Sequence, residues 1–149
     1  MSRSKAYFFL LAVLFSLSSG IAGMQDEDEI KKAVAAFYTP YIGDVVAFID
    51  KNSRVEPRDE LAKWSPHFTP ELFKAYKKIL KTPDLDYDPI LQSNNVPDAF
   101  EVKKVKIDGE TAYASLKYVG YIDTTPLLEV RLKQKDGKWL LDAIGDLNK

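Results

Sequence analysis

Cysteine is absent from this chain of 149 residues, which excludes disulfides, thiolate metal sites, cysteine nucleophiles and an N-terminal lipidated cysteine. The single histidine excludes multi-histidine metal sites within one chain. The seven glycines are not clustered, so neither a phosphate-binding loop nor a dinucleotide fingerprint is present. A basic excess is also missing, since the formal net charge is −1 and nucleic-acid-binding domains usually carry a basic stripe. We therefore expect no cofactor, no bound metal and no nucleic-acid partner.

The composition that remains is that of one globular domain. Hydrophobic residues make up 46% of the chain and charged residues 29%, which is typical of folded rather than disordered proteins. The length allows at most one ordinary domain. Without disulfides, the fold has to be stabilised by its hydrophobic core.

The N-terminus has the pattern of a signal peptide. Arg3 and Lys5 precede an apolar run of roughly a dozen residues, Ala6–Leu17, and small residues follow at 18–23. This run is shorter than a membrane span, so we expect residues 1–23 to be removed and no stable membrane anchor to remain. Their removal takes away Arg3 and Lys5 and no acid, which leaves 19 basic and 22 acidic side chains of the original 21 and 22. The sequence predicts export, to the periplasm or beyond the cell.

Residues 24–149 are predicted to form a single α+β domain that begins with a helix. Apolar residues from Ile30 to Ile49 recur every three or four positions, with the acidic residues Asp26–Glu29 at the start. Pro40 removes a backbone donor inside this pattern, so we expect one bent amphipathic helix that ends near Asn52. A short helical turn is expected over 58–64. Thr69-Pro70-Glu71 predicts a further helix start.

The second half of the chain has the period of two that is typical of strands. Four strands are predicted, at 100–107, 111–121, 127–135 and 139–144. Asp108-Gly109 and Asp136-Gly137 are typical of hairpin turns. This order predicts a four-stranded antiparallel meander that is curved around the first helix, a cone with a possible pocket at its open end. Residues 83–99, which contain three prolines, are expected to form a long irregular loop.

Four segments resemble a known family. They are Phe37-Tyr38-x-x-Tyr41-Ile42, Phe68-Thr-Pro-Glu-Leu72, Leu85-Asp-Tyr-Asp-Pro-Ile-Leu91 and Asp136-Gly-Lys-Trp139. Together they resemble the bacterial envelope family catalogued as domain of unknown function 3828. The resemblance implies a nuclear transport factor 2-like (cystatin-like) cone and an exported protein, but no reaction. Where that family often has a Gln-Asp pair after the loop, this chain has Asn94-Asn95.

The loop carries most of the candidate binding residues. Asp84-x-Asp86-x-Asp88 places three carboxylates at alternate positions, as in calcium-binding loops, but Pro89 and Asn95 stand where an EF-hand needs glycine and glutamate. We therefore expect aspartates that cap backbone donors or face solvent, and no metal site. The full set of predicted binding residues is Asp84, Asp86, Tyr87, Asp88, Gln92, Asn94 and Asn95 of the loop, with Tyr38 and Tyr41 of the first helix.

Other side chains were weighed as catalytic or binding groups. His67 has no partner in a recognisable motif, so we expect a structural histidine. Asp44 or Asp123 would be the acid of a catalytic pocket if either were buried near aromatic side chains. The aromatic side chains considered for that pocket are Tyr38, Tyr41, Tyr113, Tyr118, Tyr121 and Trp139. Lys103, Lys104, Lys106, Lys117 and Lys133 form either a surface for an acidic partner or a solvated sheet face that discourages edge pairing.

The sequence therefore favours an exported, non-enzymatic binding module of the bacterial envelope. Its ligand, a protein or a small molecule, is expected at the cone mouth and the 83–99 loop. Two alternatives stay open: an immunity or inhibitor protein that acts against an envelope-targeting toxin, and a small hydrolase or isomerase that uses a buried aspartate. The chain is expected to be a monomer or a homodimer.

Overall fold

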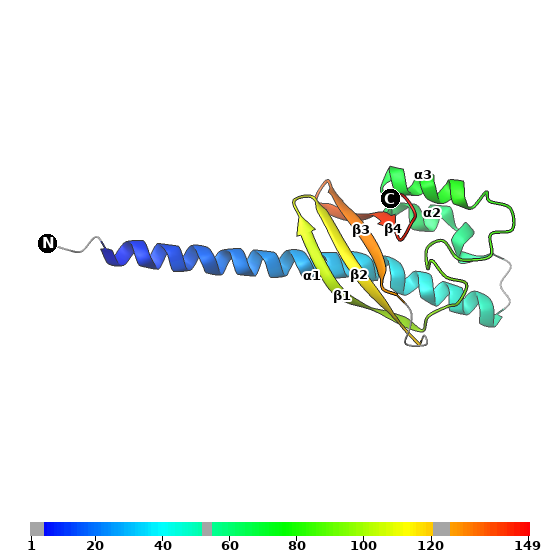
Figure 1. Cartoon of the computed structure of the whole chain (residues 1–149), viewed down its shortest axis with the longest axis horizontal. Helices are drawn as coiled ribbons and strands as arrows, with labels where there is room; N and C mark the ends of the chain where they lie inside the picture. The colour runs from blue at the N-terminus through cyan, green and yellow to red at the C-terminus, as the bar shows by residue number, and fades with distance from the viewer. Residues whose placement is uncertain (1–4, 52–54, 121–125) are drawn as a thin grey trace.

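The computed structural model describes residues 5–51, 55–120 and 126–149, with side-chain environments for 23–50, 55–120 and 126–149. The first element is a single helix, α1 (Lys5–Lys51), whose N-terminal part projects from the globular body (Figure 1). This apolar N-terminal segment is compatible with a signal sequence. The helix is expected to start beside the acidic residues 26–29, but it begins at Lys5, and no proline lies between the apolar run and Ile30 to end it.

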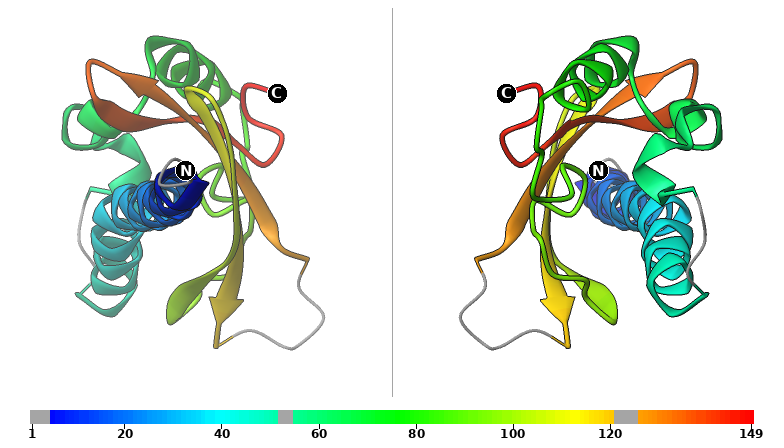
Figure 2. Two further views of the ribbon diagram at one scale, coloured as in Figure 1. Left: turned by 90° about the vertical axis from the view of Figure 1, so that its left-hand side faces the viewer. Right: turned by 90° about the vertical axis from the view of Figure 1, so that its right-hand side faces the viewer.

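The bend expected at Pro40 is present. Pro40 lies inside α1, and the helix continues to Lys51, close to the expected end at Asn52. The axis changes direction in the second half of the helix, as the end-on views make plain (Figure 2). A proline costs one intrahelical hydrogen bond and crowds the preceding turn, which accounts for a bend without a break.

Three short elements and one longer helix follow α1. They are η1 (Pro57–Asp59), α2 (Leu61–Trp64), η2 (Ser65–His67) and α3 (Pro70–Ile79). The predicted start of α3 is confirmed: Thr69 is the N-cap, and its hydroxyl accepts a hydrogen bond from the Leu72 backbone N–H. Pro70 stands at the first helical position, where no backbone donor is needed.

The four strands form one antiparallel meander in the order β1-β2-β3-β4. Their bounds are β1 (Ala99–Asp108), β2 (Thr111–Val119), β3 (Leu128–Lys135) and β4 (Lys138–Ile144), each within two residues of the prediction. Both expected hairpin turns are present, and Gly109 and Gly137 have φ of 59° and 73°. Two register shifts interrupt the ladders, one between Val102 and Lys104 and one between Arg131 and Leu132.

The core lies between one face of the sheet and the apolar side of α1. Ile30, Val34 and Phe37 of the helix are fully buried there, as are Ala112, Ala114 and Leu116 of β2. The sheet curls around α1, and α2 and α3 close the remaining side (Figure 2). By length and hydropathy alone, the segment Gly23–Asp50 could cross a membrane. In the structure its apolar face packs against the sheet and forms part of the hydrophobic core. The α+β architecture is confirmed, while the cystatin-like cone stays a prediction.

Candidate ligand-binding site

The 83–98 loop, which joins α3 to β1, is attached to the core from beneath by three tyrosine hydroxyls. Tyr38 donates to the Ile90 carbonyl oxygen at 3.3 Å, and Tyr118 donates to the Leu91 carbonyl oxygen at 3.0 Å. Tyr41 donates to Oδ2 of Asp88 at 2.8 Å. Because Ile90 and Leu91 are themselves buried, the middle of this loop belongs to the hydrophobic core and is not exposed on the surface. The loop conformation is therefore fixed from inside the domain.

Asp88 organises the loop from within. Its Oδ1 atom accepts the backbone N–H groups of Ile90 at 2.8 Å and Leu91 at 3.1 Å. Its own backbone pairs with Ser93, N–H to carbonyl oxygen at 2.8 Å, which closes a tight turn. Burial raises the pKa of Asp88 above its ordinary value, while the hydrogen bonds from Tyr41, Leu91 and Ile90 and the charge of Arg58 act in the opposite direction. The aspartate serves as a cap for backbone donors, as the sequence suggested.

The tyrosines near Asp88 are held in their neutral form. Burial, followed by the nearby Asp88 charge, raises the pKa of Tyr41 far above its ordinary range. Burial also raises the pKa of Tyr76, whose hydroxyl donates to the Arg58 carbonyl oxygen at 2.6 Å. Neither group loses a proton at physiological pH, so both act as fixed hydrogen-bond donors.

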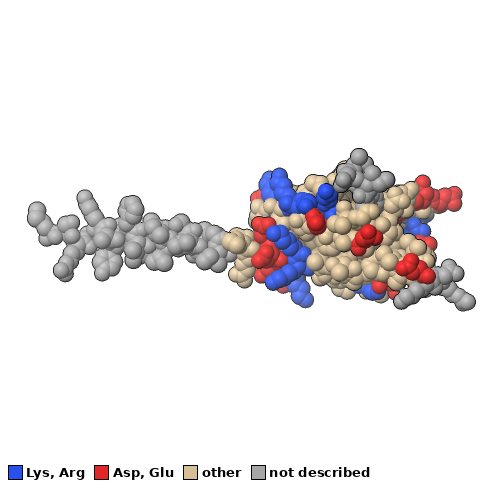
Figure 3. All heavy atoms as spheres, turned by 90° about the horizontal axis from the view of Figure 1, so that it is seen from below, with Lys and Arg blue, Asp and Glu red and all other residues tan. Residues whose placement is uncertain are grey.

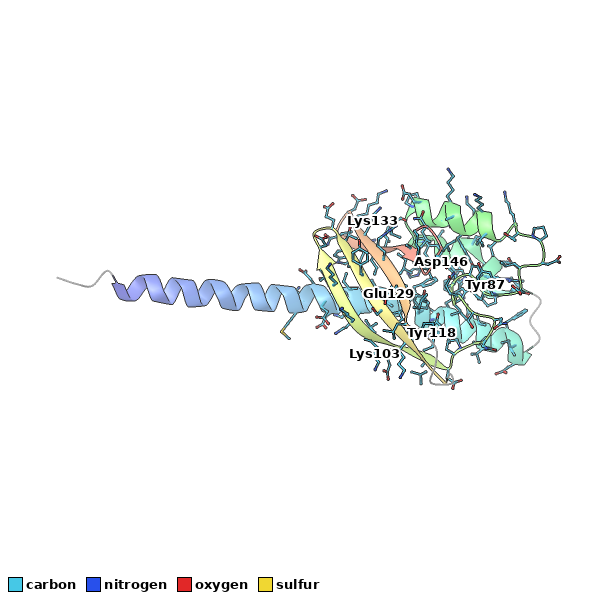
Figure 4. The ribbon with its side chains drawn as sticks, in the orientation of Figure 1. Tyr87, Lys103, Tyr118, Glu129, Lys133 and Asp146 are labelled. Atoms are coloured by element: carbon cyan, nitrogen blue, oxygen red, sulfur yellow. The ribbon has the colours of Figure 1, made fainter. Side chains whose placement is uncertain are left out.

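A pocket of about 250 Å³ opens between this loop and the C-terminal part of α1. Tyr87, Asp86 and the amides Asn94 and Asn95 line it from the loop, and Val45, Phe48 and Ile49 line it from the helix. Arg58 crosses its edge, where Nη1 donates to the Tyr87 carbonyl oxygen at 3.4 Å and Nε lies 2.5 Å from Glu56 Oε2. The mixture of apolar walls and a few polar groups is typical of ligand sites. Tyr87 lies at the end of the body opposite the N-terminal helix (Figure 4).

The predicted binding residues fall into two groups. Asp84, Asp86, Asn94 and Asn95 are exposed, and Tyr87 is half-buried at the surface. Tyr38 and Tyr41 are fully buried under the loop, so they hold it in position rather than face the solvent. Gln92 also anchors the loop: its Nε2 donates to the Pro89 carbonyl oxygen at 2.7 Å, and its Oε1 accepts the Asp146 N–H at 3.3 Å.

A second buried acid, Asp142, was not singled out from the sequence. Its carboxylate is fully buried and accepts Thr69 Oγ1 at 2.8 Å, Arg131 Nε at 2.7 Å and Lys133 Nζ at 3.2 Å. Burial acts to raise the pKa of Asp142, but these three hydrogen bonds outweigh it, and the pKa lies below its ordinary value. Asp142 is the extra residue at the register shift in β3–β4, between Leu141 and Ala143, which pair with Leu132 and Arg131. The sequence feature that indicates this buried acid is an aspartate inside the otherwise apolar strand predicted at 139–144.

The residues weighed for catalysis do not form a buried acid site in the described part of the chain. Asp44 has a side chain one-third exposed (34%) that pairs with Lys63, and Asp123 lies outside the described residues, as does Tyr121. His67 packs its ring 5.6 Å from that of Phe37, and burial lowers its pKa. Tyr113 is exposed on the sheet, whereas Tyr118 is buried beneath the loop. Among described residues, no cluster of three or more acids or histidines is suited to hold a metal.

The lysines considered as a basic surface come from β1, β2 and β3, and Lys104 and Lys106 alternate along β1 with Val105 and Ile107, which face the core. Lys103, Lys104, Lys106, Lys117 and Lys133 are all exposed. Lys103 pairs with Glu101, and Lys133 with Asp142. Basic side chains gather at the end of the body from which the N-terminal helix projects, together with acidic ones (Figure 3). Comparisons of the chain with protein-family models, with curated proteins and with solved structures found no match.

Proposed function

We propose that this protein is an exported, non-enzymatic binding module of the bacterial envelope, and that the outer surface of the 83–98 loop contacts its partner. The observation that carries the proposal is the attachment of this loop to the core through Tyr38, Tyr41 and Tyr118. A loop without secondary structure normally loses conformational entropy when it binds. A loop that is already fixed has lost that entropy during folding, so its exposed side chains bind at lower cost.

The chemistry around the loop supports binding rather than catalysis. Asp142 is buried and Asp88 is partly buried, and the oxygens of both accept hydrogen bonds from groups of the same chain. Asp88 lines the 250 Å³ pocket, but both of its carboxylate oxygens already accept hydrogen bonds from Tyr41, Ile90 and Leu91, so they hold the loop in place. The apolar N-terminal segment and the resemblance noted above support export.

The test is capture by a C-terminally tagged full chain that is expressed in its own host and recovered from an envelope extract. Bound proteins and co-purified small molecules are identified by mass spectrometry. Asp86→Ala combined with Tyr87→Ala is expected to lose the partner, because both side chains line the outer surface of the loop. The fold is expected to persist, since the anchoring hydrogen bonds from the tyrosines do not involve these side chains.

A matched control removes the same two residue types elsewhere. Asp108→Ala combined with Tyr113→Ala deletes an exposed aspartate and an exposed tyrosine on β1 and β2. This variant is expected to retain the partner. Equal capture by all three proteins, or a loss in the control as large as in the loop variant, would show that the loop is not the contact surface. The absence of any partner of the wild-type chain would contradict the binding-module proposal itself.

A further inference from the structure

A second surface, separate from the loop pocket, lies between α1 and the first strand. It is a groove of about 730 Å³ that shares no lining residue with the pocket under the loop. Its walls are largely apolar: Ile42 and Val46 project from the helix, and Phe100 and Val102 from β1. Gly43 leaves the floor open, because a Cβ atom added there would meet nothing within 4 Å. Val46 is 38% exposed, so the apolar wall of the groove is open to solvent there.

The strand beside this groove is at the edge of the sheet. The order β1-β2-β3-β4 leaves two edges, and the edge at β4 is covered: the Thr69 N–H donates to the Leu141 carbonyl oxygen at 2.8 Å, and Ile144 pairs with Leu147. In the part of the chain that the structure describes, β1 pairs only with β2. An edge strand presents unpaired backbone donors and acceptors, which an added strand can use.

The charges on β1 decide what kind of strand fits. Lys104 and Lys106 are exposed, and within the described residues neither forms an ion pair. Lys103 is paired with Glu101 (Figure 4 shows it at the outer edge), and Lys117 of β2 lies opposite Glu101. A second copy of β1 that paired with Lys104 opposite Lys106 would set lysines against lysines, and like charges on neighbouring strands are destabilising. The register shift at Lys103 divides this edge into two regular segments: 99–102, which lies next to the groove, and 104–108, which carries Lys104 and Lys106.

We propose that the β1 edge binds an extended peptide segment of another protein, in which acidic residues alternate with apolar ones. Side chains of a strand alternate between its two faces. The apolar side chains of the added strand enter the groove between Ile42, Val46 and Phe100. The acidic side chains lie on the other face, where Lys104 and Lys106 pair with them.

The experiment is a selection of random decapeptides displayed on phage against the immobilised full chain. The expected result is enrichment of sequences in which Asp or Glu alternates with Val, Ile, Leu or Phe. An enriched peptide is then synthesised, and its affinity is measured for the wild-type chain and for variants. No enrichment, or enrichment without this alternation, overturns the proposal.

Gly43→Leu is the decisive variant, because leucine fills the groove at an exposed helical position and also raises helix propensity. We expect it to weaken peptide binding at least tenfold. Ala36→Leu, at an exposed position of α1 outside the groove, is the matched control and is expected to change binding less than twofold. Equal binding by Gly43→Leu and the wild type overturns the proposal.

The charge and the place of contact are tested separately. Lys104→Glu combined with Lys106→Glu is expected to weaken the peptide at least tenfold at low salt and less at high salt, because exposed charge pairs are screened. Hydrogen exchange is expected to slow in the amides of 98–102 when the peptide binds. Protection that is confined to other residues, or a concentration-dependent dimer that Gly43→Leu abolishes, contradicts an acidic peptide as the occupant.

Discussion

Replacing Tyr41 with phenylalanine removes the hydroxyl that donates to Oδ2 of Asp88 at 2.8 Å and leaves the ring packing in place. A hydrogen bond to a charged group contributes about 1.5–3 kcal/mol, so the variant is expected to lose about 2 kcal/mol of unfolding free energy. Tyr38→Phe is the comparison, because Tyr38 donates to a neutral carbonyl oxygen at 3.3 Å. Its expected loss is about 1 kcal/mol or less.

Urea unfolding at neutral pH distinguishes the two variants. With a slope of about 2 kcal/mol per molar urea, the midpoint is expected to fall by about 1 M for Tyr41→Phe and by about half as much for Tyr38→Phe. The difference between the urea midpoints of the two variants should become smaller in acid. Burial raises the pKa of Asp88, and the Tyr41 hydroxyl lowers it again, so loss of the hydroxyl raises this pKa further. Once the carboxyl group is protonated in both proteins, Tyr41 donates to a neutral acceptor. A midpoint for Tyr41→Phe equal to that of Tyr38→Phe at neutral pH would refute the role given to Asp88.

Substitutions at Asp142, Asp88 and Thr69 test the roles of the two acids. Asp142→Asn is expected to lose about 2–3 kcal/mol of unfolding free energy at neutral pH, since Arg131 and Lys133 lose their anion. Because the pKa of Asp142 is lowered in the folded protein, the stability that it contributes is present above the unfolded pKa of 3.8 and is lost as the pH falls below that value. Urea titrations of the variant should therefore show a smaller loss of stability in acid than those of the wild type. Asp88→Asn is expected to have the opposite effect on the pH dependence of stability. Because the pKa of Asp88 is raised in the folded protein, wild-type stability declines as the pH rises from the unfolded pKa of 3.8 through the folded-state pKa, and a neutral amide should remove that decline. Thr69→Ala, which deletes both the cap of α3 and a donor to Asp142, is expected to cost about 2 kcal/mol, whereas Thr69→Ser should cost under 1 kcal/mol; equal losses for both would contradict the hydroxyl's role.

The elements of the fold could be predicted wherever local chemistry decides them. Thr69 and Pro70 start α3, Gly109 and Gly137 adopt positive φ in the hairpins, and Pro40 bends α1, because each effect depends on the residue itself or its near neighbours. The start of α1 could not be predicted in this way. The sequence predicts a signal peptide over 1–23 and a helix that follows it, and in the full chain no proline separates the two, so one helix runs on from Lys5.

The partners of the candidate site depend on contacts between residues far apart in the sequence. Tyr41 and Asp88 are 47 positions apart, and Thr69 and Asp142 are 73 apart, so no spacing rule reveals either pair. Asp142 was hidden for a further reason: strict alternation along β4 does not hold where the register shifts. The groove beside β1 likewise depends on the packing of α1 across the sheet.

The proposed function requires that the 83–98 loop is ordered before any partner binds. Native-state hydrogen exchange of the free protein tests it most directly at the amides of Ile90 and Leu91, which donate to Asp88, and of Asp88, which donates to Ser93. These three amides are expected to exchange slowly, with protection comparable to that of the strand amides of β2, and Tyr41→Phe is expected to accelerate their exchange. Exchange at the rate of an unstructured peptide in the wild-type protein would contradict a preorganised loop.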